Sequence, residues 1–381
     1  MRDKVTSVSA QPESEHRAPG AERVSARPPV EHLRSVIERA SAAAPETARG
    51  RFLILTHRGP DPDALGACEG LRRLLEVGFG QETVVATIGR IHRAENMAMV
   101  RRLDLQLADY SSIDPRTFAG AALVDTQPEF GHTVLPEDIP ILAVFDHHVP
   151  PDESRESPRP EIAHRDVRFD LGATCSMIYE YLRDASVGLD EKTASALFCG
   201  VRYDTADLSR NVTALDEEAY YETFRRADRQ AIAEIDHPPL PRDYYREIHS
   251  ALTLARQHGP LILALLGKVD NPESVAEMAD FFLRMKGVSW VVVGGAYGDE
   301  YVLSLRTDYS FGRAYPLMQR VLDGRGSFGG HGHIAGGRIP LEDSGESTIK
   351  SVERSLRANA LAVIGATDEE DSIPREGRPL S

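Results

Sequence analysis

The chain has 381 residues, of which 41% are hydrophobic and 27% charged, and its formal net charge is −15 at pH 7. This length allows two domains of ordinary size, each able to bury its own core. The acidic charge argues against a protein that holds long nucleic acid on a basic surface. It leaves room for a small phosphorylated substrate, since bound divalent cations reverse the charge locally.

No segment of the chain resembles a membrane span or an export signal. The apolar runs, such as residues 261–266, are far shorter than the ~20 apolar residues that cross a bilayer. The first thirty residues lack the apolar core of a signal peptide. We therefore expect a cytoplasmic protein that makes no membrane contact.

The three cysteines, Cys68, Cys175 and Cys199, are scattered along the chain and form no CxxC pair. A disulfide framework or a structural zinc site needs paired or regularly spaced cysteines. We expect buried, unreactive thiols.

The predicted elements begin after an extension at residues 1–29, which is poor in large apolar side chains and is expected to be disordered. The helical spacing of Leu33, Val36 and Ile37 then predicts a helix over residues 30–44.

Short apolar runs alternate with helical patterns through the next part of the chain. The runs predict a strand at 52–55 and two further strands that lead into acidic residues within 123–126 and 142–148, and the helical patterns cover 64–75 and 174–182. This alternation is typical of a doubly wound, mostly parallel α/β sheet, which we assign to residues 30–235.

A proline-rich break separates this domain from a second one. Pro238, Pro239 and Pro241 cannot continue a helix and suit a semi-rigid linker, which we place at 236–255. A smaller α/β domain is expected at 256–366, with the active-site cleft between the two domains and a disordered tail at 367–381. Its predicted strands are 261–266, 289–294 and 301–306, its helices are 272–285 and 313–322, and a glycine-rich stretch covers 327–337.

Side chains able to bind a metal follow the predicted strands of the first domain. The carboxyl ends of parallel strands are where ligands bind in open α/β sheets. Five of these side chains follow strands, and a sixth follows a short apolar run that ends at Tyr203: His57, Asp61, Asp63, Asp125, His147 and Asp204. Imidazole combined with carboxylate suits Mn²⁺, Fe²⁺, Co²⁺ or Zn²⁺ better than Ca²⁺, and Mn²⁺ is our first choice. Six donors suit two cations ~3.5–4 Å apart that share a carboxylate.

Each of these features also has a purely structural interpretation. Asp125 could cap a following helix. Asp61 and Asp63 could belong to a turn, and the pair His147-His148 could arise by chance. Their occurrence together, after successive apolar elements, favours the metal site.

The same residues resemble the ordered motifs of the DHH phosphoesterase family. The motif HxxxDxDAxG covers residues 57–66, a strand ends in Asp125, the sequence DHH covers 146–148, and Asp204-Thr205 follows. Gly329-Gly330-His331 with Ala335-Gly336 is similar to the glycine-histidine motif of the associated DHHA1 domain. The resemblance covers about residues 35–365. The domain sizes are most similar to those of the bifunctional oligoribonucleases that also hydrolyse 3′-phosphoadenosine 5′-phosphate (pAp), the nanoRNases.

The resemblance implies a role for each residue of the first domain. His57 and Asp61 bind one metal, and Asp125 bridges to a second metal. The second metal is bound by Asp63, His147 and Asp204. Two catalytic residues are implied as well: His148 faces the substrate phosphate, and Asp146 orients the adjacent histidines. A hydroxide that bridges the metals is the implied nucleophile.

In the second domain the resemblance implies a substrate-binding set: Arg306, Gly329, Gly330, His331 and His333. A guanidinium suits bidentate phosphate binding, although Arg306 could also form a surface salt bridge. Phe328 stands where the family has the first of three glycines, and His331 and His333 are both candidates for substrate contact. Directly after the glycine that ends the first motif, Ala67 replaces the usual serine.

These features predict a Mn²⁺-dependent phosphoesterase that acts on short oligoribonucleotides, on pAp or on both. The alternatives are a linear or cyclic dinucleotide phosphodiesterase, a family II inorganic pyrophosphatase, a RecJ-like exonuclease and a non-catalytic nucleotide sensor. The pyrophosphatase's Ser-Arg-Lys triplet is absent from the second domain, and the chain is too short and acidic for the further modules of RecJ-like enzymes. An intact donor set argues against the sensor. The expected partner is a short nucleotide, and a homodimer is left open.

Overall fold

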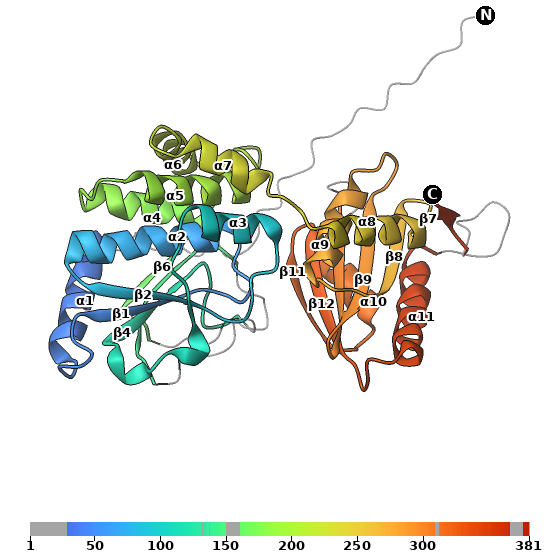
Figure 1. The fold of residues 1–381 in the computed structure, drawn as a ribbon, viewed down its shortest axis with the longest axis horizontal. Coiled ribbons are helices and arrows are strands. Elements are labelled where there is room, and N and C mark those ends of the chain that lie inside the picture. The colour runs from blue at the N-terminus through green and yellow to red at the C-terminus, as the bar shows by residue number, and fades with distance from the viewer. Residues whose placement is uncertain are drawn as a thin grey trace, which may run out of the picture. The chain divides into compact units, whose positions relative to one another are not determined.

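The computed structural model describes residues 29–130, 133, 135–136, 138–149, 161–308, 312–365 and 376–380 (Figure 1). The chain divides into two compact units, one formed by residues 1–88 and 106–228 and the other by 89–105 and 229–381. The predicted disordered extension lies outside the described residues apart from Pro29. The domain limits 30–235, 236–255 and 256–366 stay predictions.

The sheet of the first unit contains six parallel strands in the order β3-β2-β1-β4-β5-β6. They are β1 (Arg51–Leu55), β2 (Glu82–Thr87), β3 (Ala108–Asp109), β4 (Gly120–Val124), β5 (Ile141–Asp146) and β6 (His164–Val167). The predicted parallel α/β sheet is thereby confirmed. The strand order reverses between β1 and β4, and ligands bind at such a reversal in open α/β sheets.

The residues of these strands alternate between two cores. Phe52, Ile54 and Phe145 face a core that they share with three helices, α1 (Val30–Ala43), α2 (Pro62–Arg73) and α4 (Thr174–Asp184). Leu53, Leu55 and other alternate residues face a second core with Phe118 and Ile139. Within the described residues, this second core contains no α-helical residue and includes Tyr110 of a 3₁₀ turn. The strand order is therefore that of a doubly wound sheet, but the described helices in these cores lie on one face.

Further helical segments complete the first unit and its connections. These are the π-helical turn η1 (Leu74–Gly78), the 3₁₀ turns η2 (Tyr110–Ser112) and η3 (Pro115–Thr117), α5 (Glu191–Asp204) and α6 (Ala214–Phe224). Helix α5 packs along α2. Helices α3 (Ala94–Arg102) and α7 (Arg229–Asp236) contact each other and are grouped with the second unit.

The second unit is a mixed seven-stranded sheet in the order β11-β12-β10-β9-β8-β7-β13. Among the strands that the structure describes in this sheet, β8 and β9 pair in parallel and the other neighbours pair antiparallel. The strands are β7 (Arg256–His258), β8 (Leu261–Lys268), β9 (Trp290–Tyr297), β10 (Glu300–Thr307), β11 (Ser327–His331), β12 (Ile334–Pro340) and β13 (Arg378–Pro379). Helices α8 (Arg242–Leu254) and α9 (Glu273–Leu283) share one core with the sheet, and α10 (Ala314–Leu322) and α11 (Glu346–Val363) share the other.

The structure confirms the helices and strands expected from hydrophobic periodicity, with ends that shift by a few residues. The structure also contains two elements in segments where the sequence predicted neither helix nor strand. Helix α8 lies inside the predicted linker segment, and β13, inside the predicted tail, pairs with β7. The three cysteines are free and buried, as expected. Among the described helices, none combines the length and apolarity needed to span a bilayer.

Candidate metal centre

The loop after β1 carries two of the predicted ligands, His57 and Asp61, at the carboxyl edge of the sheet. Asp61 is the N-cap of α2: its Oδ1 accepts hydrogen bonds from the backbone N–H groups of Asp63 and Ala64, both at 3.0 Å. Pro62 at the first helical position has no N–H to satisfy there. Burial, followed by the nearby charges of Asp204 and Asp125, raises the pKa of Asp61 to about 6. Asp61 therefore starts the helix and also presents a carboxylate to the site.

Asp63, in the first turn of α2, is fully buried and is held by the start of another helix. Its Oδ2 accepts from Thr174 N at 2.7 Å, and its Oδ1 accepts from Cys175 N at 2.8 Å. The first N–H groups of a helix have no partner within the helix, and they carry partial positive charge. Burial and the charges of Asp125 and Asp204 nevertheless raise the pKa of Asp63 well above its usual value.

Asp125 follows β4 in a left-handed conformation, with a φ of 58°. This conformation is uncommon for a residue other than glycine, and such outliers gather at functional sites. The backbone N–H donates to Phe145 O at 2.8 Å, and Oδ1 accepts from Thr174 Oγ1 at 2.8 Å. Residues 125–130 form bends and a turn, so the helix-cap interpretation of Asp125 is wrong.

The sequence Asp146-His147-His148 begins at the last residue of β5, and the buried Asp146 orients both histidines. Its Oδ1 accepts from the backbone N–H groups of His147 and His148 and is 2.8 Å from His148 Nδ1. Its Oδ2 accepts from Gln127 Nε2 at 2.6 Å. Gln127 was not identified from the sequence, and its only signal was its position two residues after Asp125.

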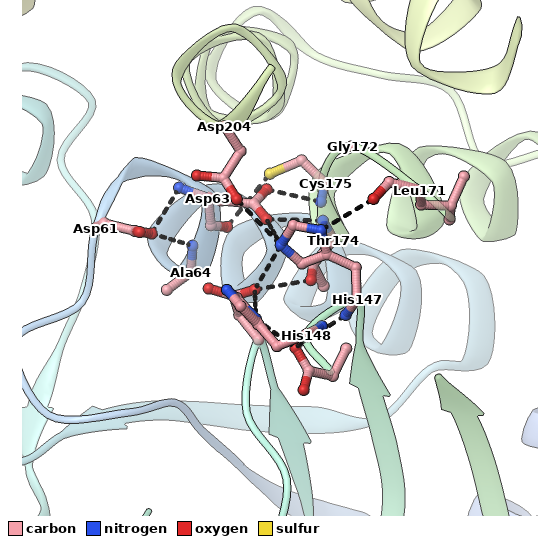
Figure 2. A network of polar contacts seen from close by, with 12 residues as sticks. Asp61, Asp63, Ala64, His147, His148, Leu171, Gly172, Thr174, Cys175 and Asp204 are labelled. Atoms are coloured by element: carbon pink, nitrogen blue, oxygen red, sulfur yellow. Dashed lines mark hydrogen bonds and ion pairs between the residues drawn. The ribbon is translucent and has the colours of Figure 1, made fainter. Parts of the chain in front are cut away.

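His147 extends toward Asp204, the last residue of α5. The distance from His147 Nε2 to Asp204 Oδ2 is 3.0 Å, and the distances to Asp63 Oδ2 and Asp125 Oδ1 are both 3.8 Å. The other ring nitrogen, Nδ1, lies 3.1 Å from Leu171 O and donates to it, since a carbonyl only accepts. Figure 2 shows Asp63, Asp204 and His147 pointing toward one another.

The six predicted donors, together with His148, thus form three groups whose ligand atoms lie within 4.8 Å of one another. The groups are His57, Asp61 and Asp125; Asp63, His147 and Asp204; and Asp125, His147 and His148. Asp125 Oδ2 is 3.5 Å from His57 Nε2, while Oδ1 is 3.6 Å from His148 Nδ1. Asp125 therefore belongs to two groups.

The donor set fits divalent cations. In the described part of the chain, Asp125 Oδ2 and His147 Nε2 are buried and make no hydrogen bond, although ionisable groups lie within 4 Å of each. Such buried polar atoms are costly unless they coordinate an ion. The clustered carboxylates also repel one another, and a bound cation relieves that repulsion.

The neighbouring carboxylates change the pKa values of the histidines. Burial alone would lower the pKa of His57, but contact with Asp125 and the charge of Asp61 raise it to about 9. The pKa of His148 is also about 9, since Asp125 and Asp146 outweigh its burial. Burial would raise the pKa of Asp125, but the surrounding histidines hold it below its usual value. Without metal, protons therefore stand in for part of the positive charge that the site requires.

In the second unit, the predicted substrate-binding residues lie on β10, on β11 and in the turn between β11 and β12, and β12 separates β10 from β11. Arg306 of β10 lies opposite Ile334 of β12, which pairs in turn with His331 of β11. The side chain of His331 is outside the described atoms. Gly330 has a φ of 154°, and a Cβ there would come within 2.4 Å of Ile334 O, whereas a Cβ at Gly329 would meet nothing within 4 Å.

Arg306 and His333 already have protein partners in this unit. Arg306 Nε is 2.5 Å from Asp280 Oδ1, and its Nη1 donates to Ser304 Oγ at 2.7 Å. His333 Nδ1 is 3.1 Å from Thr307 Oγ1. The salt-bridge interpretation of Arg306 is thus confirmed as a contact, and its phosphate-binding role stays a prediction.

Comparison with known proteins places these residues in context. The model of the DHHA1 domain matches residues 258–358. An uncharacterized protein of Methanocaldococcus jannaschii is 31% identical over 332 residues, which are 85% of this chain and 66% of that protein. The chain thus spans about two thirds of that relative's length.

Solved structures of other proteins resemble this one. An exopolyphosphatase-related protein from Bacteroides fragilis has the same fold and superposes with a TM-score of 0.67 at 16% identity, covering 88% of this chain and 97% of that one. RecJ in complex with Mn²⁺ from Thermus thermophilus is a weaker match, with a TM-score of 0.46 at 14% identity, covering 92% of this chain and 56% of that one. The DHHA1 match covers most of the second sheet, while the DHH sequence stands at a strand end of the first sheet. Residues 258–358 thus belong to the DHHA1 domain family, and the first sheet, which carries the DHH sequence, is similar to the DHH phosphoesterases in its motifs.

Proposed function

We propose that this protein is a Mn²⁺-dependent phosphoesterase that hydrolyses short oligoribonucleotides, pAp or both. One observation carries the proposal: the two carboxylate oxygens of Asp125 face different imidazoles. Oδ2 lies 3.5 Å from His57 Nε2, and Oδ1 lies 3.8 Å from His147 Nε2. A carboxylate in this position can be shared by two cations.

The residue roles follow from the groups around Asp125. His57 and Asp61 would hold one cation, and the second cation would be held by Asp63, His147 and Asp204. When bound, two divalent cations lower the pKa of water and neutralise charge on a phosphoryl group. Thr174 keeps the shared carboxylate in place through its hydroxyl.

His148 is the most exposed imidazole of the cluster, with 30% of its side chain accessible, against 16% for His57 and 11% for His147. Asp146 orients the ring through Nδ1 at 2.8 Å. We assign His148 to contact with the substrate phosphate, because its ring is the most exposed imidazole of the cluster and Asp146 holds it in place. An imidazole N–H can donate a hydrogen bond to a phosphate oxygen.

The second unit would supply the remaining substrate contacts. Arg306 offers a guanidinium for a terminal phosphate, and Gly329 lets a ligand approach the backbone because no side chain covers it. His331, at the end of β11, and His333, in the turn that follows β11, are the candidate hydrogen-bond donors. The chain's charge of −15 favours a small substrate over a long polyanion.

The test uses the purified full chain, freed of metal and then supplied with Mn²⁺. It is assayed for phosphate or nucleotide release from pAp, a dinucleotide, a five-residue RNA, a cyclic dinucleotide and pyrophosphate. We expect turnover of the short RNA or of pAp, and loss of that turnover in Asp125→Asn. The matched control is Asp114→Asn, since Asp114 is a surface N-cap of a 3₁₀ turn that contacts Arg116.

Four outcomes would contradict the proposal. Pyrophosphate as the only substrate would favour a pyrophosphatase, and turnover of the cyclic dinucleotide alone would favour a cyclic dinucleotide phosphodiesterase. Tight nucleotide binding without turnover in the presence of Mn²⁺ would favour a sensor. Full Mn²⁺-dependent activity in Asp125→Asn would refute the shared carboxylate.

A further inference from the structure

The peptide plane between Leu171 and Gly172 lies directly behind His147. Its carbonyl oxygen, Leu171 O, is 3.1 Å from His147 Nδ1. Its amide, Gly172 N–H, donates to Asp216 Oδ2 at 3.0 Å. Because a peptide bond is planar and trans, its C=O and N–H point in opposite directions and rotate together. The carboxylate of Asp216 therefore fixes the orientation of the carbonyl that holds the His147 imidazole.

Asp216 is more than a helix cap. It lies in the first turn of α6, where it forms a capping box with Thr213: Oδ2 accepts from Thr213 N at 2.8 Å and from Thr213 Oγ1 at 2.7 Å. The capping box needs only these local contacts. Asp216 is nevertheless fully buried, and its Oδ1 makes no hydrogen bond within the described residues. Burying a carboxylate is costly, and a cap on an exposed helix end would avoid that cost.

The 171–172 peptide is confined as well as hydrogen-bonded. A Cβ at Gly172 would come within 2.7 Å of both Asn211 O and Thr205 Cγ2, and within 3.1 Å of Asp216 Oδ2. Gly172 therefore has no room for a side chain on the side that faces Asn211, Thr205 and Asp216. Thr205, which packs against Gly172, is the next residue after Asp204. Asp204 in turn faces His147.

We propose that Asp216 is a positioning residue for the metal centre, which acts on His147 through the Leu171–Gly172 peptide. This inference rests on the proposed function. A negative charge on the N–H side polarises the peptide and strengthens the hydrogen bond that its carbonyl accepts. Metal-binding histidines commonly donate their second ring N–H to a carboxylate or a carbonyl. Here one peptide unit is inserted between the carboxylate and the imidazole.

Three variants of the full chain separate positioning from helix capping: Asp216→Ala, Asp216→Asn and Thr213→Ala. For each, the free energy of unfolding is measured in urea, and Mn²⁺ affinity is measured by titration calorimetry. We expect Asp216→Ala to bind the cation near His147 about 10- to 100-fold more weakly, the usual range for loss of an outer partner of a metal ligand. Asp216→Asn keeps an oxygen that can accept the same three hydrogen bonds, and should restore the affinity to within a few-fold. Thr213→Ala should lose stability but keep its affinity.

Unchanged Mn²⁺ affinity in Asp216→Ala would overturn the inference, as would an equal loss of affinity in Thr213→Ala. Asp216→Asn provides a test that does not depend on the folding of the alanine variant. In metal-free protein labelled with ¹⁵N at histidine, loss of the Asp216 charge should move the His147 Nδ1–H resonance upfield and leave that of His57 in place. An unmoved His147 resonance would also overturn the inference. Because this measurement needs no metal, a wild-type protein that binds no Mn²⁺ would refute the proposed function and still allow the link to His147 to be judged.

Discussion

Gly200 of α5 lies against Asp63 of α2 so closely that a Cβ at Gly200 would come within 2.9 Å of the Asp63 Cα. The same Cβ would come within 2.3 Å of Cys175 Sγ. On the facing helix, a Cβ at Gly66 would meet Ala196 O at 2.4 Å. The two glycines therefore allow α2 and α5 to approach each other, and this approach brings Asp63 and Asp204 to the same site.

Gly200→Ala is expected to push the two helices apart. Alanine favours a helix by up to ~1 kcal/mol over glycine, so a net loss of stability would report crowding. We expect a loss of about 1–3 kcal/mol in the free energy of unfolding, the usual cost of overpacking a core. Mn²⁺ affinity should fall as well, since Asp63 and Asp204 separate. Urea unfolding and calorimetry measure both effects.

The control for this substitution is Gly188→Ala. A Cβ at Gly188 would meet nothing within 4 Å, so neither stability nor Mn²⁺ affinity should change. If Gly200→Ala behaved like this control, close helix approach would not be what aligns the carboxylates.

Thr174 links the N-terminus of α4 to two of the carboxylates. Its N–H donates to Asp63 Oδ2, and its hydroxyl donates to Asp125 Oδ1 at 2.8 Å. Thr174→Val keeps the shape and the N–H but removes the hydroxyl. We expect turnover to fall about tenfold, which corresponds to ~1.4 kcal/mol, because Asp125 loses a fixed contact.

Thr174→Ser retains the hydroxyl and should keep most of the wild-type turnover in the same assay. Equal activity in the valine and wild-type proteins would show that the left-handed backbone at Asp125 is sufficient to position its carboxylate.

The clustering of the six candidate donors could be predicted from the sequence because five of them follow short apolar strands, and parallel strands bring their carboxyl ends to one edge. The residues that hold these donors in place have no comparable position after a strand by which they could be recognised. Thr174 was recognisable only as the start of a helix, and its pairing with Asp63 depends on how α4 packs against α2. The contact of Leu171 O with His147 involves backbone atoms, which no side-chain pattern marks.

The sequence pattern also did not predict which face of the first sheet the helices cover. Alternation of strands and helices predicted helices on both faces, but it does not determine which face each helix covers. In the structure, Leu53 and Leu55 pack against Phe118 and Ile139 outside the α-helices. Apolar loop residues took the place of a helix, and loop residues carry no periodicity by which they could be recognised.

Mn²⁺ binding should strengthen as the pH rises toward 9. The pKa of His57 is raised from 6.5 to about 9, so the metal-free protein holds a proton there at neutral pH. A metal must displace that proton, because only neutral imidazole is a ligand. Calorimetry in two buffers of different ionisation enthalpy should therefore detect proton release. An affinity that does not change with pH would contradict the raised pKa.

The same pKa shift has the opposite consequence for the metal-free fold. A group whose pKa is raised on folding contributes stability that is complete below its unfolded pKa and is lost as the pH rises through its folded pKa. For His57 this window extends from 6.5 to about 9. The stabilisation by added Mn²⁺, measured as a rise in Tm, should therefore grow across this window. A constant difference in Tm would show that His57 does not exchange a proton for the metal.

Arg306 has a guanidinium that is held before any substrate arrives. Its Nε contacts Asp280 Oδ1 at 2.5 Å, and its side chain is 11% exposed. If this group binds a terminal phosphate, Arg306→Ala should raise the KM for pAp about 10- to 100-fold with little change in kcat. This range corresponds to the ~1.5–3 kcal/mol of a hydrogen bond to a charged group. Steady-state kinetics with pAp and with a dinucleotide that lacks a terminal phosphate make the comparison.

Two further variants distinguish phosphate binding from the salt bridge. Arg338→Ala removes an exposed arginine, paired with Glu300 at 2.7 Å on the same sheet, and should leave the KM unchanged because such surface pairs contribute ~0–1 kcal/mol. Asp280→Asn breaks the salt bridge but keeps the guanidinium, so the KM for pAp should stay level or fall. If Asp280→Asn and Arg306→Ala lowered stability alike and neither changed the KM, Arg306 would be a structural residue and the phosphate contact would have to come from another group.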